Sequence, residues 1–510
     1  MTAKRLLKSM FGRLGIVSFS ILIQILFLTS ILVFLSSQAF IIYVLLQLCS
    51  VFAVLYIVGK NENPSFKIPW IIMILVLPLV GGISYMLWGN KRIPKSLQKR
   101  LEEYYYNELA SFAIGEDPTI DLKNTDLSLY KQCEYIKRTS GFPVWQNTAC
   151  EFFPLGDDKL PRMLQELEKA QHFIFLEYFI IEQGIMWNSI LDVLKMKMEQ
   201  GVKVYLMYDD MGTISTLPVG YDEYLSSLGI HVTVFNPYTP HLNMAMNYRD
   251  HRKICVIDGN VGFCGGANLA DEYINKVNIH GHWKDTAVML QGDGVWNLTT
   301  LFITLWNFSN AEDPLKFYEY VPTISCQTDG YVQPFGDSPL DNVNVGQGAY
   351  LNMINMAIDY IYVTTPYLII DHETMTAFIN AAQSGIDVRI ITPYIGDKWF
   401  VHMTTRSYYR PLIEAGVKIY EYRPGFIHSK QCVSDDKVAI VGTINMDFRS
   451  LYLHFECGVS FYKSSIVDAV RQDIINTLEV CHQVTLEDTI VYNPFKRLIV
   501  AILKVFAPLM

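Results

Sequence analysis

The pattern His-x-Lys-x-x-x-x-Asp occurs twice in this 510-residue chain, and this duplication constrains the fold more than any other feature. The motif residues are His251, Lys253 and Asp258 in the first copy and His428, Lys430 and Asp435 in the second. The two histidines lie 177 positions apart, which is about the length of one folded domain. The repeat therefore predicts two similar lobes that each supply half of one site.

Both copies continue in the same way after the aspartate. Gly265, Gly266 and Asn268 follow the first motif, and Gly442, Thr443 and Asn445 follow the second. In each copy the histidine and the asparagine are 17 positions apart. Two hairpins with incidental polar residues would not share these elements, so the pattern indicates a duplicated catalytic half-site.

The residue types suit phosphoryl transfer. A neutral histidine is a nucleophile toward phosphorus, and a protonated histidine can donate its proton to a leaving alkoxide. Lysine ammonium groups and asparagine N–H groups can hold the phosphoryl oxygens in the transition state. Because Lys253 and Lys430 can neutralise the phosphate, we expect no metal and no other cofactor. His280, His282 and Cys264 match no strong zinc pattern.

The paired motifs resemble the phospholipase D superfamily, and the residues around them resemble the bacterial cardiolipin synthases in particular. The resemblance covers nearly the whole chain and is carried by residues 247–253, Gly265-Gly266-Ala267-Asn268, Asp271-Glu272-Tyr273, Trp283-Lys284-Asp285-Thr286, residues 445–450 and Phe455-Glu456. Two positions depart from the family pattern. Gly266 stands where the superfamily often has Ser or Thr, and His454 stands where Asn is expected before Phe-Glu.

The resemblance implies a cardiolipin synthase. Such an enzyme would transfer a phosphatidyl group reversibly between two phosphatidylglycerol molecules, giving cardiolipin and glycerol through a phosphohistidine intermediate. His251 is expected to be the nucleophile and His428 the general acid and then the general base. The motifs leave this order open, and the resemblance favours it.

The resemblance also implies roles for the other residues of the motifs. Lys253, Lys430, Asn268 and Asn445 are expected to bind the phosphate, in turns that include Gly266 and Thr443. A phosphate would repel Asp258 and Asp435, so we expect these carboxylates to pair with basic or backbone donors behind the site.

Two further carboxylates are candidates for supporting the histidines. In relatives, a carboxylate at the position of Glu456, 28 residues after His428, accepts a hydrogen bond from the imidazole and fixes its tautomer. We expect Asp285 to serve His251 in the same way.

Three other functions compete with the synthase. A phospholipase D hydrolase would use water as the acceptor, and the motifs do not separate it from a transferase. A non-catalytic membrane scaffold is disfavoured because His, Lys and Asn are intact in both copies. A nuclease is disfavoured by the net charge of −9, since nonspecific nucleic-acid binding requires a broadly basic surface.

The N-terminal part is apolar enough to enter a membrane. Residues 16–35, 40–58 and 71–88 carry no charged side chain, and each segment is about 20 residues long. A signal peptide has one short apolar core, so three such segments in succession predict membrane-spanning helices instead. We expect two or three crossings in a bacterial cell membrane.

The orientation rests on two weaker signals. Basic residues precede the first apolar segment and follow the last one: Lys4, Arg5, Lys8, Arg13, Lys91, Arg92, Lys95, Lys99 and Arg100. The positive-inside rule favours the cytoplasm for both clusters, which two crossings allow and three do not. The nine cysteines suggest no paired framework, which favours a reducing compartment and a cytoplasmic catalytic region.

The rest of the chain predicts an α/β fold of two phospholipase D-like lobes related by a pseudo-twofold axis. Alternating patterns predict strands at 173–181, 202–208, 231–235, 360–370, 388–393 and 417–422, with helices at 187–199, 221–228, 373–383 and 410–415. Strands that alternate with helices imply parallel pairing. Packing of the two lobes should bring His251 and His428 together at their interface.

The expected organisation has five parts. A transmembrane region covers residues 1–92, a connector 93–140, the first lobe 141–325, the second lobe 326–490 and an amphipathic tail 491–510. The tail is short for a crossing and is expected to lie on the membrane surface, with a core helix of the second lobe as the alternative. The sequence is compatible with an oligomer.

Overall fold

The computed structural model describes residues 23, 26, 37–89, 118–237, 247–327, 330–340, 343–491 and 493–509. These residues fall into two compact units, one with the N-terminal helices and one with both lobes, and each unit is treated separately. The basic residues before the first apolar segment and those between positions 91 and 100 lie outside the described residues. So does the segment 16–35, apart from Ile23 and Leu26.

The first lobe is built on a sheet with the strand order β1-β9-β7-β6-β2-β3-β4. Its parallel half consists of β2 (Phe173–Tyr178), β3 (Lys203–Asp209) and β4 (His231–Phe235). Its antiparallel half consists of β6 (Lys253–Ile257), β7 (Val261–Gly265), β9 (Ala287–Gly292) and β1 (Thr148–Phe153). The predicted parallel pairing is confirmed, with α10 (Ile185–Glu199) and α12 (Tyr221–Ser227) as the connecting helices.

Helices cover both faces of this sheet, which explains why β2 is buried at every position. On one face lie α9 (Gly156–Glu168) and α10, whose apolar residues follow helical spacing. On the other face lies α13 (Val295–Ser309), which also contacts the second lobe. The ring of Phe302 in α13 stacks on Phe175 of β2, with centroids 4.3 Å apart. Contact with both lobes explains why α13 is buried all round.

The second lobe repeats this architecture with the strand order β10-β19-β17-β16-β11-β13-β14-β20. Its parallel strands are β11 (Tyr360–Thr364), β13 (Asp387–Pro393) and β14 (Lys418–Tyr422), connected through α15 (His372–Gln383), α16 (Trp399–Arg406) and α17 (Tyr409–Glu414). Its antiparallel strands are β16 (Gln431–Ser434), β17 (Val438–Gly442), β19 (His454–Tyr462), β10 (Tyr331–Asp337) and β20 (Cys481–Gln483).

The predicted strand over 360–370 is wrong in its length. The strand β11 ends at Thr364, and Leu368–Ile369 forms a separate short strand, β12, which pairs with β18 (Met446–Asp447). Pro366 lies between the two strands. Proline has no N–H to donate, so it interrupts a central strand.

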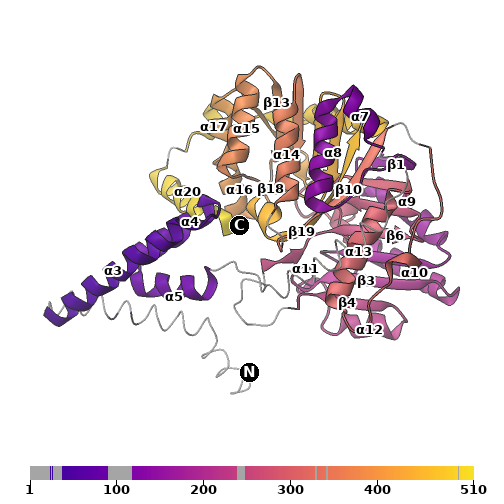
Figure 1. Cartoon of the computed structure of the whole chain (residues 1–510), viewed down its shortest axis with the longest axis horizontal. Coiled ribbons are helices and arrows are strands. Elements are labelled where there is room, and N and C mark those ends of the chain that lie inside the picture. Colours follow the sequence, from indigo (N-terminus) through magenta and orange to yellow (C-terminus); the bar gives the residue numbers. More distant parts are fainter. Residues whose placement is uncertain are drawn as a thin grey trace. The chain divides into compact units, whose positions relative to one another are not determined.

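Residues 118–140 of the predicted connector pack on the second lobe. They form α7 (Ile120–Thr125) and α8 (Leu127–Ser140), and α8 lies beside α14 (Val345–Met356), as Figure 1 shows. The side chain of Gln132 donates to the carbonyl of Ala349, and that of Gln333 donates to the carbonyl of Cys133. This helix is therefore part of the helical cover of the second lobe.

Among the described residues 37–89, the N-terminal unit has three apolar helices: α3 (Ser37–Val58), α4 (Pro64–Val76) and α5 (Pro78–Trp88). Within α3, Ile41–Val58 is long and apolar enough to cross a membrane. The predicted continuous segment at 71–88 is wrong, because α4 ends at Val76 and a new helix starts at Pro78. Helices α4 and α5 pack against each other, and Gly81 approaches the backbone of Met73 too closely to carry a Cβ atom.

Candidate active site

Two short strand pairings join the lobes at the motifs. The strand β5 (Arg249–Asp250), directly before His251, pairs in parallel with the start of β19 in the second lobe. The strand β15 (Gly425–Ile427), directly before His428, pairs in parallel with β8 (His282–Lys284) of the first lobe. The backbone N–H of His251 then donates to the carbonyl of Phe455, and that of His428 donates to the carbonyl of Lys284. Each motif histidine is thus held by a segment of the other lobe.

This exchange determines which carboxylate each imidazole meets. His251 Nδ1 lies 2.9 Å and 3.1 Å from the two carboxylate oxygens of Glu456. His428 Nδ1 lies 2.6 Å from Oδ2 of Asp285. An ionised carboxylate can only accept, so the contact with Glu456 places the proton of His251 on Nδ1 and the lone pair on Nε2. Nδ1 of His428 contacts both Asp285 and, at 2.7 Å, Nζ of Lys430, and the shorter contact with the carboxylate favours the same tautomer. Both imidazoles are held in the tautomer that a nucleophile or a general base requires.

The pairing of carboxylates with histidines is the reverse of the sequence-based expectation. We expected Asp285 beside His251 and Glu456 beside His428, each within its own lobe. The structure pairs Asp285 with His428 and Glu456 with His251. The reason is that β8 leads directly into Asp285 while bound to the strand before His428, and the start of β19 leads into Glu456 while bound to the strand before His251.

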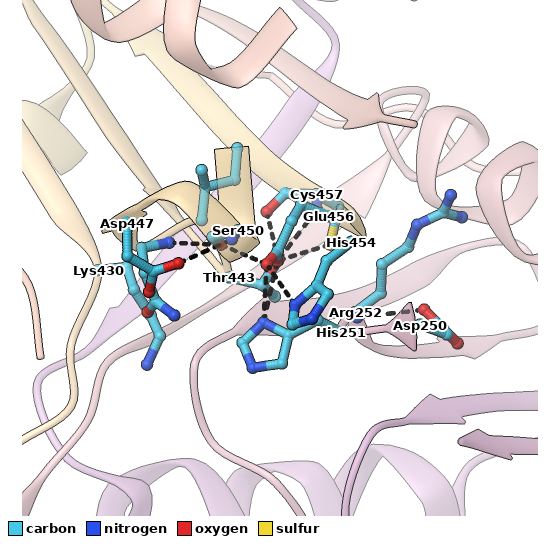
Figure 2. Close-up of polar contacts among 12 residues, drawn as sticks. Asp250, His251, Arg252, Lys430, Thr443, Asp447, Ser450, His454, Glu456 and Cys457 are labelled. Atoms are coloured by element: carbon cyan, nitrogen blue, oxygen red, sulfur yellow. Dashed lines mark hydrogen bonds and ion pairs between the residues drawn. The ribbon is translucent and has the colours of Figure 1, made fainter. Parts of the chain in front are cut away.

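The turns after the two motifs make different contacts with these carboxylates. A Cβ atom at Gly266 would lie 2.1 Å from Oδ1 of Asp285, so only glycine fits there. At the equivalent position in the second lobe, the hydroxyl of Thr443 donates to Glu456. Ser450 donates a second hydroxyl to the same carboxylate, as Figure 2 shows. The absence of a hydroxyl at position 266 is therefore a requirement of the close approach of Asp285.

The two motif lysines are fully buried between the histidines and the carboxylates. Lys253 Nζ donates to the carbonyl of His251, and Lys430 Nζ donates to that of His428. Burial lowers the pKa of Lys253 to about 8, although Glu456 opposes the shift. Burial lowers the pKa of Lys430 to about 7, opposed by Asp285. At pH 7 Lys253 is therefore mostly charged and Lys430 about half charged, and little solvent screens the charge they carry.

Burial and the lysines also keep the histidines neutral. Burial, followed by the charges of Lys253 and Lys430, holds the pKa of His251 well below its usual range. Burial and Lys430 lower the pKa of His428 to about 4, although Asp285 opposes the shift. Without a bound anion, both rings are therefore neutral near pH 7, with a lone pair available on each Nε2.

The two asparagines differ in their contacts. Both ends of the Asn268 amide form hydrogen bonds: Oδ1 accepts from the N–H of Ile180, and Nδ2 donates to the hydroxyl of Tyr273. Asn445 is buried, and its Oδ1 has no hydrogen-bond partner among the described residues. Asn268 has one remaining N–H for a ligand, and it also fixes the loop that follows β2.

Asp258 and Asp435 have equivalent backbone contacts behind the site. Asp258 accepts hydrogen bonds from the N–H groups of residues 171–173, and Asp435 accepts them from those of residues 358–360. Both residues have positive φ angles, of 52° and 54°, which aspartate tolerates better than most residues. Each carboxylate thus fastens the turn of its motif to the start of a central strand.

Ser450 had no role in the sequence-based prediction, and Thr443 was expected in a phosphate-binding turn rather than beside a carboxylate. Ser450 and Thr443 bind Glu456, and the ring of Phe179 lies edge-on to His251 at 5.1 Å between centroids. His454 was noted as a departure from the family, and its ring lies 5.3 Å from that of His251. The signal for Ser450 was its place in the family-like segment 445–450. Contacts across the lobes have no such signal in the sequence.

The two-lobed architecture with paired His and Lys motifs defines an enzyme of the phospholipase D class, and comparisons with known proteins agree. A family model described as "Cardiolipin synthase, PLD-like domain" matches residues 163–280 and 350–478, once in each lobe. A second model, "Phospholipase_D-nuclease N-terminal", matches residues 48–90. A crystal structure of phosphatidylserine synthase from Haemophilus influenzae is similar in fold, with a TM-score of 0.58 and 13% identity over 74% of this chain and 98% of that one.

Similarity to whole proteins is more specific. A cardiolipin synthase from Halalkalibacterium halodurans is 33% identical over 87% of this chain and 89% of its own length. An uncharacterized protein from Streptococcus mutans is 41% identical over 90% of this chain and 99% of its own length. The chain belongs to the cardiolipin synthase family of the phospholipase D superfamily.

The buried lysines predict a basic limit to activity. The value of kcat/KM reports the free enzyme, in which burial lowers the pKa of Lys430 to about 7 and that of Lys253 to about 8. A lysine with a lowered pKa is charged below that pH and neutral above it, so an anionic substrate is bound less well at higher pH. We expect kcat/KM to fall as the pH rises above about 7. In Lys430→Arg the guanidinium stays charged, so this fall should begin at higher pH. An unchanged profile in Lys430→Arg would exclude Lys430 as its source.

Proposed function

We propose that this protein joins two phosphatidylglycerol molecules to give cardiolipin and glycerol, with a phosphohistidine as the intermediate. The observation that carries the proposal is the crossed pair of histidine–carboxylate contacts beside two buried lysines. Each ring is oriented through Nδ1 with Nε2 free, as a nucleophile and an acid–base partner require. Membership of the cardiolipin synthase family supplies phospholipids as the substrate class.

In the first half-reaction, Nε2 of His251 attacks the phosphorus of one phosphatidylglycerol. A P–N bond forms and the P–O bond to the terminal glycerol breaks. His428, protonated on Nε2 once the phosphate anion is bound, gives its proton to the leaving alkoxide, and free glycerol departs. Glu456 stabilises the positive charge that develops on the ring of His251.

The second half-reaction runs the same steps in reverse with a different alcohol. Nε2 of His428, now neutral, takes the proton from the terminal hydroxyl of a second phosphatidylglycerol. The hydroxyl oxygen attacks the phosphorus, the P–N bond to His251 breaks, and cardiolipin forms. Asp285 stabilises the imidazolium of His428 in this step. Because the alcohols are chemically equivalent, the reaction is reversible.

Lys253 and Lys430, with the amide groups of Asn268 and Asn445, would hold the phosphate oxygens in both steps. The turns at Gly266 and Thr443 bring these groups together. Asp258 and Asp435 would act at a distance, by fixing each motif to the adjacent strand through three backbone N–H groups. No step of this mechanism requires a metal.

A hydrolase is the second candidate within the same chemistry, with water in place of the second alcohol. The apolar helices favour the transferase, because a membrane concentrates lipid acceptors at the site. The deciding experiment uses purified enzyme in vesicles of phosphatidylglycerol with excess chelator and no nucleotide. We expect cardiolipin and glycerol in nearly equal amounts. Predominance of phosphatidic acid would identify a hydrolase, and loss of all activity in chelator would contradict the metal-free mechanism.

Because Asp285 contacts His428 and Glu456 contacts His251, we expect removal of either carboxylate charge to impair a different step. Asp285→Asn should impair protonation of the leaving group by His428, and Glu456→Gln should impair attack by His251. Each should lower turnover of phosphatidylglycerol by about 10²–10⁴-fold. A phosphatidyl ester of p-nitrophenol has a leaving group that needs no proton. Release of p-nitrophenol in the first turnover should therefore recover in Asp285→Asn but not in Glu456→Gln, because only the second half-reaction then still needs His428 as a base.

Two variants control this experiment. Asp192→Asn removes an exposed carboxylate of α10 and should behave as the wild type. With the p-nitrophenyl donor, His428→Asn should accumulate a labelled adduct on His251. Two outcomes would reverse the roles of the histidines. One is recovery of p-nitrophenol release in Glu456→Gln instead of Asp285→Asn. The other is an adduct that forms only in His251→Asn, on His428.

We also propose that the N-terminal residues 1–92 anchor the enzyme in the bacterial cell membrane by two crossings. Residues 16–35 and α3 would be the crossings. Helices α4 and α5 have 13 and 11 residues, about 20 Å and 16 Å, and are each too short for a hydrocarbon core of about 30 Å. A hairpin of these helices would enter the membrane and return to the same side. Both basic clusters would then face the cytoplasm.

The remaining parts follow from this arrangement. Residues 93–140 would link the membrane region to a first lobe at 141–325 and a second lobe at 326–490. The tail at 491–510 contains α20 (Pro494–Phe506), in which no residue is buried. Its large apolar side chains Phe495, Leu498 and Ile502 are exposed, at helical spacing, with Lys496, Arg497 and Lys504 on the same helix. This composition suits a helix on an anionic membrane surface.

The orientation can be tested with one introduced thiol. All nine cysteines are free, which favours a reducing compartment for the lobes. On a background without accessible native thiols, we expect Asp192→Cys on the exposed side of α10 to remain unlabelled by an impermeant maleimide in intact cells. Opening the membrane should allow labelling. Ready labelling in sealed cells would put the catalytic lobes outside and would contradict the proposed topology.

A further inference from the structure

His454 is a buried histidine beside the nucleophile that the mechanism does not use. Its side chain is 7% exposed, and neither ring nitrogen has a hydrogen-bond partner among the described residues. A buried polar atom without a partner costs about 1–3 kcal/mol. Family resemblance leads us to expect asparagine at this position, so the imidazole is a feature of this chain.

The ring of His454 is directed at the carboxylate that holds His251. Its Nδ1 lies 3.7 Å from Oε1 of Glu456, and Nδ1 of His251 lies 2.9 Å from the same oxygen. One ligand atom from each of the three residues lies within 4.8 Å of the others. Around a tetrahedral zinc ion with bonds of about 2.0–2.1 Å, ligand atoms are about 3.3 Å apart. The separations of 2.9 Å and 3.7 Å between the histidine nitrogens and Oε1 of Glu456 lie below and above this value.

The surroundings of the three residues also suit a metal. Both oxygens of Glu456 already accept hydrogen bonds, from Ser450 and Thr443, and such partners orient a ligating carboxylate. The ring of Phe179 lies against both imidazoles and limits access of water. Figure 2 shows His251, His454 and Glu456 facing one another.

We propose that His251, His454 and Glu456 bind one transition-metal ion of the zinc type, and that the bound ion inhibits the enzyme. The ion replaces the Nδ1 proton of His251, which passes to solvent. The ion also binds the carboxylate of Glu456, which then no longer stabilises positive charge on the ring of His251. An imidazole with a metal on Nδ1 is a poorer nucleophile at Nε2. The inhibition, but not the binding, rests on the proposed role of His251.

The chemistry of the donors sets the selectivity. Two imidazoles and one carboxylate suit Zn²⁺, Ni²⁺ and Cu²⁺, whereas Mg²⁺ and Ca²⁺ prefer sites made of oxygen ligands. The charges of Lys253 and Lys430 oppose any cation, so the site should bind more weakly than a structural zinc site. A chelator should therefore preserve or raise activity in preparations that contain traces of zinc.

Binding is measured first, without lipid, because phospholipid headgroups also bind Zn²⁺. The full-length protein in nonionic detergent is stripped with chelator, exchanged into chelator-free buffer and titrated with Zn²⁺ against a fluorescent zinc indicator. We expect one site per chain that His454→Asn weakens at least tenfold. His372→Asn removes an exposed histidine of α15 and should leave the site unchanged. Glu456→Gln, tested for binding only, should also lose it.

Two further measurements separate loss of the site from loss of the fold. Thermal unfolding of metal-free His454→Asn should resemble that of the wild type. Co²⁺ should give the visible bands of a tetrahedral nitrogen and oxygen site in the wild type and not in His454→Asn. If a misfolded variant prevents the comparison, absence of these bands in the wild type is by itself sufficient to overturn the proposal.

Inhibition is measured next, in phosphatidylglycerol vesicles, relative to each variant's own metal-free rate. Zn²⁺ should inhibit the wild type and His372→Asn, and at least tenfold more Zn²⁺ should be needed for His454→Asn. Mg²⁺ should not inhibit. Equal zinc affinity in the wild type and His454→Asn would overturn the site. Binding without inhibition would retain the site and contradict the proposed role of His251, and failure to form cardiolipin in any condition would contradict the proposed function alone.

Discussion

Two parallel pairings of a few residues each connect the lobes at the motifs, and the geometry of the site depends on them. The residues before His251 pair with the start of β19, and the residues before His428 pair with β8. Because each pairing is one residue away from both a histidine and a carboxylate, the imidazoles and their acceptors are fixed by backbone hydrogen bonds. Each motif histidine meets its carboxylate only across the interface between the lobes. The site therefore requires both lobes in one arrangement.

The charge distribution of the site follows from its burial. Lys253, Lys430, Asp285 and Glu456 are all buried, and removing each ion from water costs several kcal/mol. The cost is offset in part by mutual attraction and by hydrogen bonds, including the hydroxyls of Thr443 and Ser450. The same burial lowers the pKa of both lysines and both histidines. In the proposed function, a bound phosphate would interact with both lysines, whose charges the two carboxylates already balance.

The two halves of the site are similar in backbone and different in chemistry. Asp285 approaches the turn of Gly266 so closely that no side chain fits, whereas Glu456 receives a hydroxyl from Thr443. Glu456 also has His454 nearby, and no histidine is equivalent to it beside Asp285 among the residues described here. The duplicated motif thus has two chemically different halves, and the carboxylate that accepts two hydroxyl hydrogen bonds lies beside the proposed nucleophile.

The sequence by itself determined the class of chemistry and half of each sheet. The spacing of His, Lys, Asp and Asn in two copies predicts a phosphoryl-transfer site, because these groups are needed regardless of the fold. Alternation of apolar strands and helices predicts β2, β3 and β4 and their counterparts, since local periodicity reflects burial of both faces. Pro366 and Pro78 each interrupt a segment that was predicted to be continuous. Both interruptions could have been predicted, because proline lacks the backbone N–H that a continuous strand or helix requires.

Only the tertiary structure decided which carboxylate serves which histidine. The family resemblance suggested Asp285 for His251 and Glu456 for His428, and the structure exchanges them. The convergence of His454 on Glu456 and the need for glycine at position 266 are also tertiary effects. Each depends on atoms from distant segments meeting at an interface, and pairing between lobes leaves no periodic pattern in either segment. The residue types are local information, whereas their partners are set by the packing of one lobe on the other.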